Sequence, residues 1–530
     1  MTFHSDITRL ILTKKIQTKD ELHKEKIRLC KKYHLTTIPP DSEILACLPT
    51  DSTEEEKQTA YDVLRKKPMR TISGVTIIAV MTSPEPCPHG RCLPCPGGPE
   101  KNTPQSYTGY EPAAMRAIFH DFNPYYQVTS RLEQLHAIGH PTDKIDLILM
   151  GGTFTARLPD YQQWFVKRCF DALNQKQAKT LTQAQHINET AHSRCIGLTV
   201  ETRPDWFRLF HADTALYLGA TRVELGVQTV YDDILYGIKR GHTVSDSIAA
   251  TRVAKECGFK VCYHMMPGLP GSTPKKDLEV FRIIFEDQRF KPDMIKIYPT
   301  LITKDTRLYD LWKTGTYKPY TLDQTISLIA QIKQYVPEWV RIQRIQRDIP
   351  VPHITAGVKK GNLRQLVNKK LQTQGKTCRC IRCREIGHRS LKQPLTFHDD
   401  QLILRRYHYE ASGGTEIFLS LEDKRHDVLV GFIRIRDLMQ PHRYELLRRP
   451  SMIIRELKIL GRELSIGEKQ KQGMQHKGYG KELVHEAERI CVEDFDKKTL
   501  VVLSGIGVKA YYRKLGFSDD GVYLSKYLKK

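Results

Sequence analysis

The stretch "CPHGRCLPCPGGP", residues 87–99, places three cysteines directly behind the apolar run "VTIIAV" of residues 75–80. The run is short and rich in β-branched residues, which is typical of a buried strand. Cys87, Cys92 and Cys95 follow it with the spacing C-x4-C-x2-C. Because thiolates bind soft metals and iron–sulfur clusters, the stretch predicts a metal centre on a loop at the end of a strand.

The spacing of these three thiols is compatible with more than one kind of centre. Three ligands on one loop suit a 4Fe–4S cluster and leave one iron open to a small molecule. Plant-type ferredoxins use the same spacing with a distant fourth cysteine, which Cys169 or Cys195 would have to supply here. A zinc ion and a set of unligated buried thiols are the other two interpretations.

Further strand-like runs follow at regular intervals and alternate with stretches long enough for helices, which predicts a parallel sheet of βα units. Six such repeats indicate an open or partial version of a βα (TIM-like) barrel, in which chemistry collects at the C-terminal ends of the strands. The unusual motifs all follow such runs, and so fall on one face of the expected sheet. The runs are "VTIIAVM", "IDLILM", "CIGLTV", "RVELGV", "KVCYHMM" and "DMIKIYP".

Length and composition favour a multidomain protein of a reducing compartment. The chain has 530 residues, which is too long for one compact core. It contains no apolar run of about 18 residues, and its first residues lack the pattern of a secretory signal. Thirteen cysteines in a chain of this length argue for metal-bound thiolates rather than a disulfide scaffold. We therefore expect a cytoplasmic protein without a membrane segment.

The charge of the chain points to a polyanionic partner. The formal net charge is +23, and nucleic acid is the commonest partner of so basic a protein. The charge is concentrated in residues 341–395, where a second cysteine group, Cys378, Cys380 and Cys383, precedes His388. Four nitrogen and sulfur ligands at short spacing suit a structural zinc ion, and unpaired loop thiols are the alternative.

The last part of the chain predicts a separate mixed α/β domain. The strand-like runs "EIFLSLE", "VLVGFIRIR" and "SMIIRELKILG" precede the glycine loop and helix of "MQHKGYGKELVHEAERI". Leu483, Val484, Ala487 and Ile490 form one apolar stripe along that helix. Free N–H groups at a helix start bind phosphate oxygens, although a glycine pair before a helix is weak evidence by itself.

The motifs together resemble a known family. A three-cysteine loop after the first strand and "GGT" after the second resemble the radical S-adenosylmethionine (SAM) superfamily, although C-x3-C-x2-C is the commoner spacing there. From about residue 70 onward the chain closely resembles the catalytic subunit of Elongator, a tRNA-modifying family that joins a radical SAM domain to a GNAT acetyltransferase-like domain. The motifs carrying this likeness include "CPHGRCLPCPGGP", "QSYTGYEPAAMRA", "ETRPD", "ELGVQT", "IKIYPTLI", "RIQRDIP", "CRCIRCREIGH" and "YYRKLGF".

The resemblance implies an activity. A 4Fe–4S cluster would cleave SAM to a deoxyadenosyl radical, which would take hydrogen from the methyl group of acetyl-CoA. The resulting carbon radical would add to C5 of uridine 34 in a tRNA anticodon, and loss of CoA by hydrolysis of the thioester would leave a carboxymethyl group. The target base would have to leave its stack. A protein lysine acetyltransferase with a structural cluster and a non-catalytic tRNA-binding scaffold are the rival functions. The electron donor, accessory subunits and self-association stay open.

The resemblance also implies site residues. Gly151, Gly152 and Thr153 would hold the amino group of SAM, and Glu201, Arg203 and Gln228 its ribose and carboxylate. Lys296 and Tyr298 alternate onto one face of their strand, where they serve the active site or fill the barrel. In the last domain, Tyr511 and Tyr512 would lie near the thioester, and Glu456 would be a base or a solvent-facing residue. The CoA pyrophosphate would be cradled by Gln475, His476, Lys477, Gly478, Tyr479 and Gly480.

The expected organisation has four parts. Residues 1–70 form a helical region that caps the next domain or contacts RNA, and residues 71–340 form the radical SAM barrel. Residues 341–395 form a basic, zinc-binding linker, and residues 396–530 form the GNAT-like domain. Linker residues expected to contact the tRNA backbone are Arg341, Arg344, Arg347, Lys359, Lys360, Arg364, Lys369, Lys370, Arg379, Arg382 and Arg384.

Overall fold

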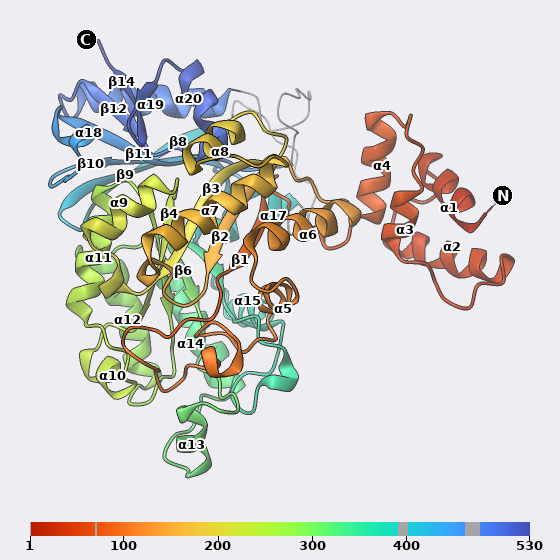
Figure 1. The fold of residues 1–530 in the computed structure, drawn as a ribbon, viewed down its shortest axis with the longest axis horizontal. Helices are drawn as coiled ribbons and strands as arrows, with labels where there is room; N and C mark the ends of the chain where they lie inside the picture. Colours follow the sequence, from red (N-terminus) through yellow and green to blue (C-terminus); the bar gives the residue numbers. More distant parts are fainter. Residues whose placement is uncertain (1, 69–70, 391–400, 462–477, 530) are drawn as a thin grey trace.

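The computed structural model describes residues 2–68, 71–390, 401–461 and 478–529. Four N-terminal helices form a small bundle that lies beside the main body (Figure 1). Thr2, Thr18 and Thr53 cap three of these helices with reciprocal capping boxes, so local sequence fixes where each begins. The helices are α1 (Phe3–Leu12), α2 (Lys19–Lys32), α3 (Asp41–Ala46) and α4 (Glu54–Leu64).

A seven-stranded sheet forms the centre of the molecule, and every neighbouring pair of its strands is parallel in the order β1 to β7. Strands β1 to β6 are rich in apolar residues, as is typical of parallel strands packed against helices. The strands are β1 (Thr76–Met81), β2 (Lys144–Met150), β3 (Arg194–Thr202), β4 (Arg222–Gln228), β5 (Lys260–Met265), β6 (Met294–Ile297) and β7 (Arg341–Arg344).

The connecting helices complete the α/β architecture. They are α5 (Pro112–Phe119), α6 (Pro124–Ala137), α7 (Pro159–Asn174), α8 (Leu181–Asn188), α9 (Leu209–Tyr217), α10 (Asp232–Gly237), α11 (Val244–Glu256), α12 (Pro274–Glu286), α13 (Arg307–Lys313) and α14 (Leu322–Tyr335). Strands β1 and β7 lie at opposite edges and do not pair with each other, so the sheet is a half-barrel with an open side. The partial barrel expected from the sequence is therefore present, with seven strands rather than six.

The seventh strand lies where the sequence predicted the basic linker to begin. Strand β7 reads "RIQR", and a strand of four mostly polar residues has no apolar run to reveal it. Helix α15 (Leu363–Thr373) follows, and its residues Leu363, Val367 and Leu371 are buried in the core of the half-barrel. Two short helices, α16 (Ile381–Arg384) and α17 (Ile386–Ser390), complete the segment. Much of residues 341–390 is thus part of the first domain's core.

The second sheet also has seven strands, in the order β13-β14-β12-β11-β10-β9-β8. It is mixed, because β11 and β12 are parallel and the other neighbours are antiparallel. Helix α19 (Tyr479–Glu493) buries the predicted stripe of Leu483, Val484, Ala487 and Ile490 against this sheet. The remaining elements are β8 (Leu402–Ala411), β9 (Gly414–Asp423), β10 (Val428–Asp437), α18 (Tyr444–Leu447), β11 (Ser451–Ile459), β12 (Thr499–Val502), α20 (Lys509–Lys514), β13 (Ser518–Asp520) and β14 (Tyr523–Tyr527).

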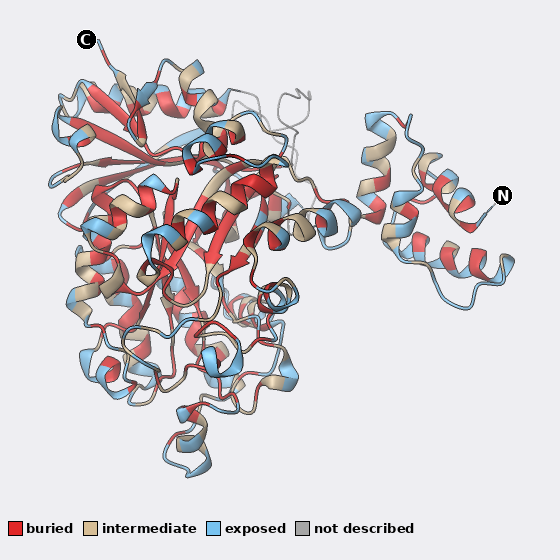
Figure 2. Cartoon of the chain, viewed as in Figure 1, coloured by how far each residue is buried: buried red, intermediate tan, exposed pale blue. Residues whose placement is uncertain are grey.

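The second sheet packs against the end of the half-barrel at which the parallel strands begin (Figure 2). Gly505 lies on the start of β3, where an added Cβ would come within 2.1 Å of the carbonyl oxygen of Ile196. Arg455 of β11 donates to the carbonyl of Phe259, just before β5. In barrels of this type the N-terminal ends of the strands serve stability, which leaves the opposite end for chemistry.

No helix in the described part of the chain is long and apolar enough to cross a membrane.

Candidate active site

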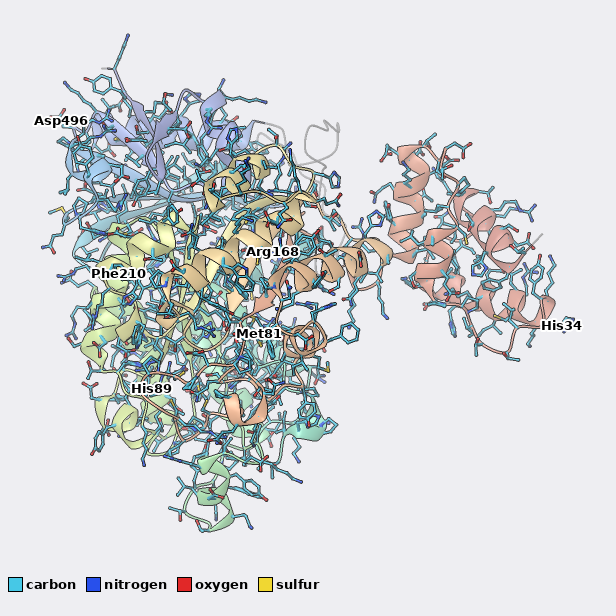
Figure 3. The ribbon with its side chains drawn as sticks, viewed as in Figure 1. His34, Met81, His89, Arg168, Phe210 and Asp496 are labelled. Atoms are coloured by element: carbon cyan, nitrogen blue, oxygen red, sulfur yellow. The ribbon has the colours of Figure 1, made fainter. Side chains whose placement is uncertain are left out.

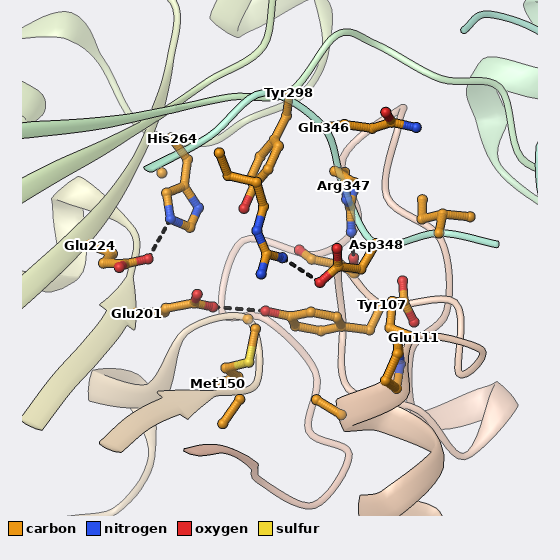
Figure 4. Close-up of a pocket in the computed structure, with 18 of the residues that line it drawn as sticks. Tyr107, Glu111, Met150, Glu201, Glu224, His264, Tyr298, Gln346, Arg347 and Asp348 are labelled. Carbon is orange, nitrogen blue, oxygen red and sulfur yellow. Dashed lines mark hydrogen bonds and ion pairs between the residues drawn. The ribbon is translucent and has the colours of Figure 1, made fainter. Parts of the chain in front are cut away.

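A cavity of about 1040 Å³ opens along the uncovered side of the half-barrel (Figure 4). Its lining includes Thr76 at the start of the edge strand β1 and Met150 at the end of β2. The cavity therefore extends over the length of a strand, about 20 Å. The three cysteines of the first loop line the end of the cavity at which the parallel strands finish.

The three sulfurs of the cysteine loop are not all drawn together in the way that a single metal ion requires. Cys92 and Cys95 are buried, and Cys87 is half-buried. Two thiolates on one zinc ion lie about 3.8 Å apart, because Zn–S bonds of about 2.3 Å meet at the tetrahedral angle. Among the described residues, the sulfurs of this loop are not a group lying within 4.8 Å of one another, whereas those of Cys378, Cys380 and Cys383 are. The three loop sulfurs are thus more widely spaced than those of the second cysteine group.

Hydrogen-bond donors surround the loop sulfurs. The Ser106 backbone N–H donates to Sγ of Cys95 at 3.2 Å, and the Arg240 guanidinium lies 3.7 Å from Sγ of Cys92. A ring nitrogen of His89, which Figure 3 labels, is 3.0 Å from that same sulfur. Such donors stabilise thiolate ligands and tune the potential of a cluster. The donor set thus fits an iron–sulfur centre.

Cys169 and Cys195 do not complete this ligand set. Cys195 lies at the start of β3, and the cavity-lining Glu201 lies six residues further along the strand, about 20 Å away. Burial and then the neighbouring Cys195 raise the pKa of the Cys169 thiol, so Cys169 lies beside Cys195 and away from the loop. The interpretation as a plant-type centre completed by either cysteine is therefore wrong.

The predicted Gly151–Thr153 loop lies directly against the cysteine loop. Gly152 has a φ of +85°, and a Cβ added there would lie 3.7 Å from Sγ of Cys87. Gly151 has a φ of +144°, and its Cβ would come within 1.9 Å of the Thr82 hydroxyl. The Thr153 hydroxyl is 3.5 Å from Sγ of Cys87. The positive φ of both residues and the close contact between Gly151 and Thr82 require glycine at these two positions.

Two of the residues predicted to bind SAM carry polar atoms without a described partner. The side-chain oxygen of Gln228 and one terminal nitrogen of Arg203 are buried and make no hydrogen bond within the described part of the chain. Arg203 uses its other nitrogens to pair with Asp205 at 2.6 Å. Buried polar atoms are rarely left unpaired, so these two mark places where a polar ligand fits.

A group of charged side chains forms the floor of the cavity. Glu201 accepts a hydrogen bond from the Tyr107 hydroxyl at 2.7 Å and lies 3.4 Å from the Lys296 ammonium. Lys296 also pairs with Glu224. The Glu224 carboxylate accepts a hydrogen bond from a ring nitrogen of His264 at 2.7 Å. Burial would lower the pKa of Lys296, but the Glu224 and Glu201 carboxylates outweigh it and hold the pKa above its ordinary value. Lys296 is therefore a buried cation of the barrel interior.

Tyr298 lies beside this floor and lines the cavity directly (Figure 4). Burial raises the pKa of its phenol, so the group stays protonated at neutral pH. Sequence alternation placed Lys296 and Tyr298 on one face, and the structure separates them into an ion-paired interior residue and a cavity-lining residue.

The predicted CoA residues are only partly described. Gln475, His476 and Lys477 lie outside the described residues. Gly478 begins helix α19 with a φ of +96°, and Tyr479 is buried. A Cβ added to Gly480 would lie 2.7 Å from the Tyr511 hydroxyl, so this phenol lies against the first turn of the helix.

The other two candidates in this domain are less accessible. Tyr512 is buried, and burial raises the pKa of its phenol well above the ordinary value. Glu456 accepts a hydrogen bond from Arg434 at 2.8 Å. Its side chain is largely buried and paired with that arginine, so it does not face solvent. Of the two tyrosines, Tyr511 is thus the one beside the helix start.

The second cysteine group comes together as expected, but without the histidine. The donor atoms of Cys378, Cys380 and Cys383 all lie within 4.8 Å of one another, and the group does not include His388. The nearest recorded acid of that histidine is Glu385, at 3.7 Å. The Lys333 ammonium lies 3.6 Å from Sγ of Cys383 and favours its thiolate.

The eleven basic residues predicted to contact tRNA differ in how far other parts of the protein engage them. Several are engaged in the protein itself: Arg341 pairs with Glu385, Arg344 with Asp348 and Arg379 with Glu338. Arg384 is fully buried and pairs with Glu422, so its prediction as an RNA contact is wrong. Residues that are exposed or line the cavity are Arg344, Arg347, Lys359, Lys360, Arg364, Lys369 and Arg382.

Sequence reasoning missed four residues of this site. Tyr107, Glu224, Arg240 and His264 all line the cavity, and each contacts either another site residue or a loop thiol. Tyr107 lies within "QSYTGYEPAAMRA" and Glu224 opens "ELGVQT", so both stood in motifs already singled out. Strand alternation puts His264 on the same face of β5 as Cys262, which was a signal that the sequence offered. Nothing in the sequence marked Arg240.

Comparisons with known proteins bear on this geometry. The ELP3 N-terminal domain model matches residues 1–72, the Radical SAM superfamily model residues 87–284 and the Radical_SAM C-terminal domain model residues 292–373. The chain is 51% identical to the tRNA uridine(34) acetyltransferase of Methanocaldococcus jannaschii, over 97% of this chain and 95% of the relative. It is 42% identical to Elongator complex protein 3 of Schizosaccharomyces pombe, over 95% of this chain and 93% of the relative.

A solved structure is also similar. The archaeal Methanocaldococcus infernus Elp3 with an N-terminal deletion superposes with a TM-score of 0.77 at 47% identity. The match covers 86% of this chain and 100% of that chain.

Proposed function

Because the chain belongs to the family of Elongator complex protein 3 and the tRNA uridine(34) acetyltransferases, we propose that it modifies uridine 34 of tRNA with SAM and acetyl-CoA. The finer proposal is that the product carries a carboxymethyl group on C5 of the base. The observation that supports SAM-dependent chemistry at this site is the closeness of three loop thiols, a glycine loop and unpartnered polar atoms at one end of a large cavity.

Cys87, Cys92 and Cys95 would hold a 4Fe–4S cluster, which when bound supplies the electron that splits SAM. Gly151 and Gly152 let the backbone approach the cluster end of the cavity. The unpartnered atoms of Arg203 and Gln228 would receive polar groups of SAM. Tyr298 and Tyr107 line the remaining space.

The second domain would supply the acetyl group. The N–H groups at the start of α19, with Gly478 and Gly480, suit the CoA pyrophosphate in a GNAT-like domain. The Tyr511 hydroxyl lies against that helix start, so it would lie beside the bound CoA. This domain packs at the far end of the half-barrel, and the cavity lining extends toward that end as far as Thr76, at the start of β1.

The function is tested with protein reconstituted without oxygen. We expect a C5-substituted uridine in unmodified tRNA only when SAM, a reductant and acetyl-CoA are all present, measured by mass spectrometry of nucleosides. Acetylated protein without modified uridine would instead favour a lysine acetyltransferase. Binding of tRNA with neither product would favour a scaffold, and either result would contradict the proposal.

We further propose that Cys378, Cys380 and Cys383 bind a structural zinc ion, supported by the closeness of their sulfurs. Replacing Cys380 with serine is expected to remove about one zinc ion per chain while the iron content is kept, because the two sites share no ligand. Metal analysis by mass spectrometry measures both. Replacing His388 with alanine is the matched control and should leave zinc in place. Wild-type protein that holds no zinc would contradict this assignment.

A further inference from the structure

The helix that borders the cavity on the β1 side has an unusual surface. Helix α5 reads "PAAMRAIF", which is apolar on every side except for Arg116. Ala114 and Ala117 pack inward against Met81. The outer face is left uncovered: Met115 is 50% exposed and Phe119 is 81% exposed. An apolar helix is normally buried all round, and a contiguous exposed apolar patch usually marks a binding surface.

Further aromatic rings extend this patch on both sides of the helix. Tyr110, just before α5, is 50% exposed, lines the cavity and stacks on His353 with ring centroids 3.5 Å apart. Tyr126 of α6 is 55% exposed. We define the α5 surface as Tyr110, Met115, Arg116, Phe119, Tyr126 and Arg131.

Two arginines lie within the α5 surface and next to the cavity. Arg116 donates one nitrogen to the Ala79 carbonyl at 2.5 Å, while its Nε is buried and has no partner among the described residues. Arg131 of α6 lines the same cavity. Burial and the nearby charge of Arg131 lower the pKa of Arg116 to about 10. No carboxylate is recorded within salt-bridge distance of Arg116 in the described part of the chain, so an anion at this position would compensate the charge of the Arg116 guanidinium.

We propose that the α5 surface binds the unpaired nucleotides that flank the target uridine. Bases would stack on the exposed aromatic rings, and a backbone phosphate would lie between Arg116 and Arg131. Basic side chains interleaved with exposed aromatics are the chemistry that recognises single-stranded nucleic acid. The surface is continuous with the cavity in which the target base would react, and this inference rests on the proposed tRNA function.

The phosphate contact is tested by the salt dependence of RNA binding. The probe is a 17-nucleotide anticodon stem-loop, and its Kd is measured by fluorescence anisotropy between about 50 and 200 mM KCl, without SAM or acetyl-CoA. Arg131→Gln is expected to reduce the slope of log Kd against log salt by about 0.7–0.9, the value of one lost phosphate contact. Arg116→Gln should do the same, and Arg116→Lys should keep most of the slope. The control is Arg282→Gln, an exposed α12 arginine paired with acidic neighbours, which should leave the slope unchanged.

The stacking contact is tested separately. Phe119→Ala and Tyr110→Ala are each expected to weaken binding of the stem-loop by about 5- to 100-fold, while binding of a fully paired duplex with the same stem is unchanged. Tyr236→Ala, which removes an 88% exposed ring on α10, is the control. Circular dichroism confirms that each variant is folded.

Unchanged slopes together with unchanged stem-loop affinity would overturn the proposal. So would variants that leave RNA binding intact and alter only self-association measured by light scattering, because the surface would then be a protein interface. If the variants weaken RNA binding as expected but wild-type protein never modifies uridine, the surface assignment stands and the proposed function fails.

Discussion

Replacing Cys92 with serine is expected to abolish uridine modification and SAM cleavage together. Cys92 is buried, and its sulfur lies beside the Arg240 guanidinium and His89. Loss of one of three ligands leaves a cluster with too few thiolates on a loop that offers no replacement. The expected loss is about 10³-fold or more in rate, equivalent to at least about 4 kcal/mol of activation free energy. Iron and sulfide analysis with quantification of 5′-deoxyadenosine measures the effect.

The matched control for this variant is Cys47→Ser. Cys47 is an exposed cysteine of the N-terminal bundle, and its loss should leave iron content and 5′-deoxyadenosine unchanged. A Cys92→Ser protein that binds iron and cleaves SAM at the wild-type rate would refute the assignment of this loop as the cluster site.

The second large effect is expected at the contact between the two domains. Arg455 of β11 is fully buried and donates to both oxygens of Asp293 and to Glu416. Burial would raise the pKa of Asp293, but Arg455, Lys255 and Arg434 hold it well below its ordinary value, so the acid is charged at neutral pH. Removing one partner from such a cluster leaves buried charge uncompensated. Arg455→Met is therefore expected to lower the free energy of unfolding by about 3–5 kcal/mol.

Urea unfolding followed by tryptophan fluorescence measures this loss. Arg406→Met is the matched control, because Arg406 forms a half-exposed pair with Asp494, and such pairs contribute about 0–1 kcal/mol. Arg455→Lys keeps the charge but not the bidentate geometry and should fall between the two. An Arg455→Met protein as stable as the control would show that the cluster does not hold the domains together.

The apolar patterns of the sequence predicted the parallel sheet, its strand-end loops and the second sheet, because continuous β-branched runs require burial on both faces. The cysteine loop, Gly152 and Gln228 all line one cavity because each lies at the end of a strand, and parallel strands end on the same side of a sheet. The sequence did not reveal β7, since "RIQR" has no apolar period and is a strand only through its pairing with β6.

Charged residues were the hardest to place from sequence. Fourteen basic residues against two acids in 341–392 suggested one RNA-binding face. The partners of Arg379 and Arg384 come from outside this segment, at Glu338, Asp427 and Glu422. No local pattern distinguishes an arginine paired within the fold from one exposed to a ligand. Arg240, which contacts a loop thiol from 148 residues away, was missed for the same reason.

The most direct measurement follows the hydrogen that leaves acetyl-CoA. Protein reconstituted without oxygen is incubated with SAM, a reductant, unmodified tRNA and acetyl-CoA deuterated on its acetyl methyl group. The account predicts that 5′-deoxyadenosine is formed and carries deuterium, as measured by mass spectrometry. Absence of 5′-deoxyadenosine, or its formation without deuterium while uridine is modified, would contradict it.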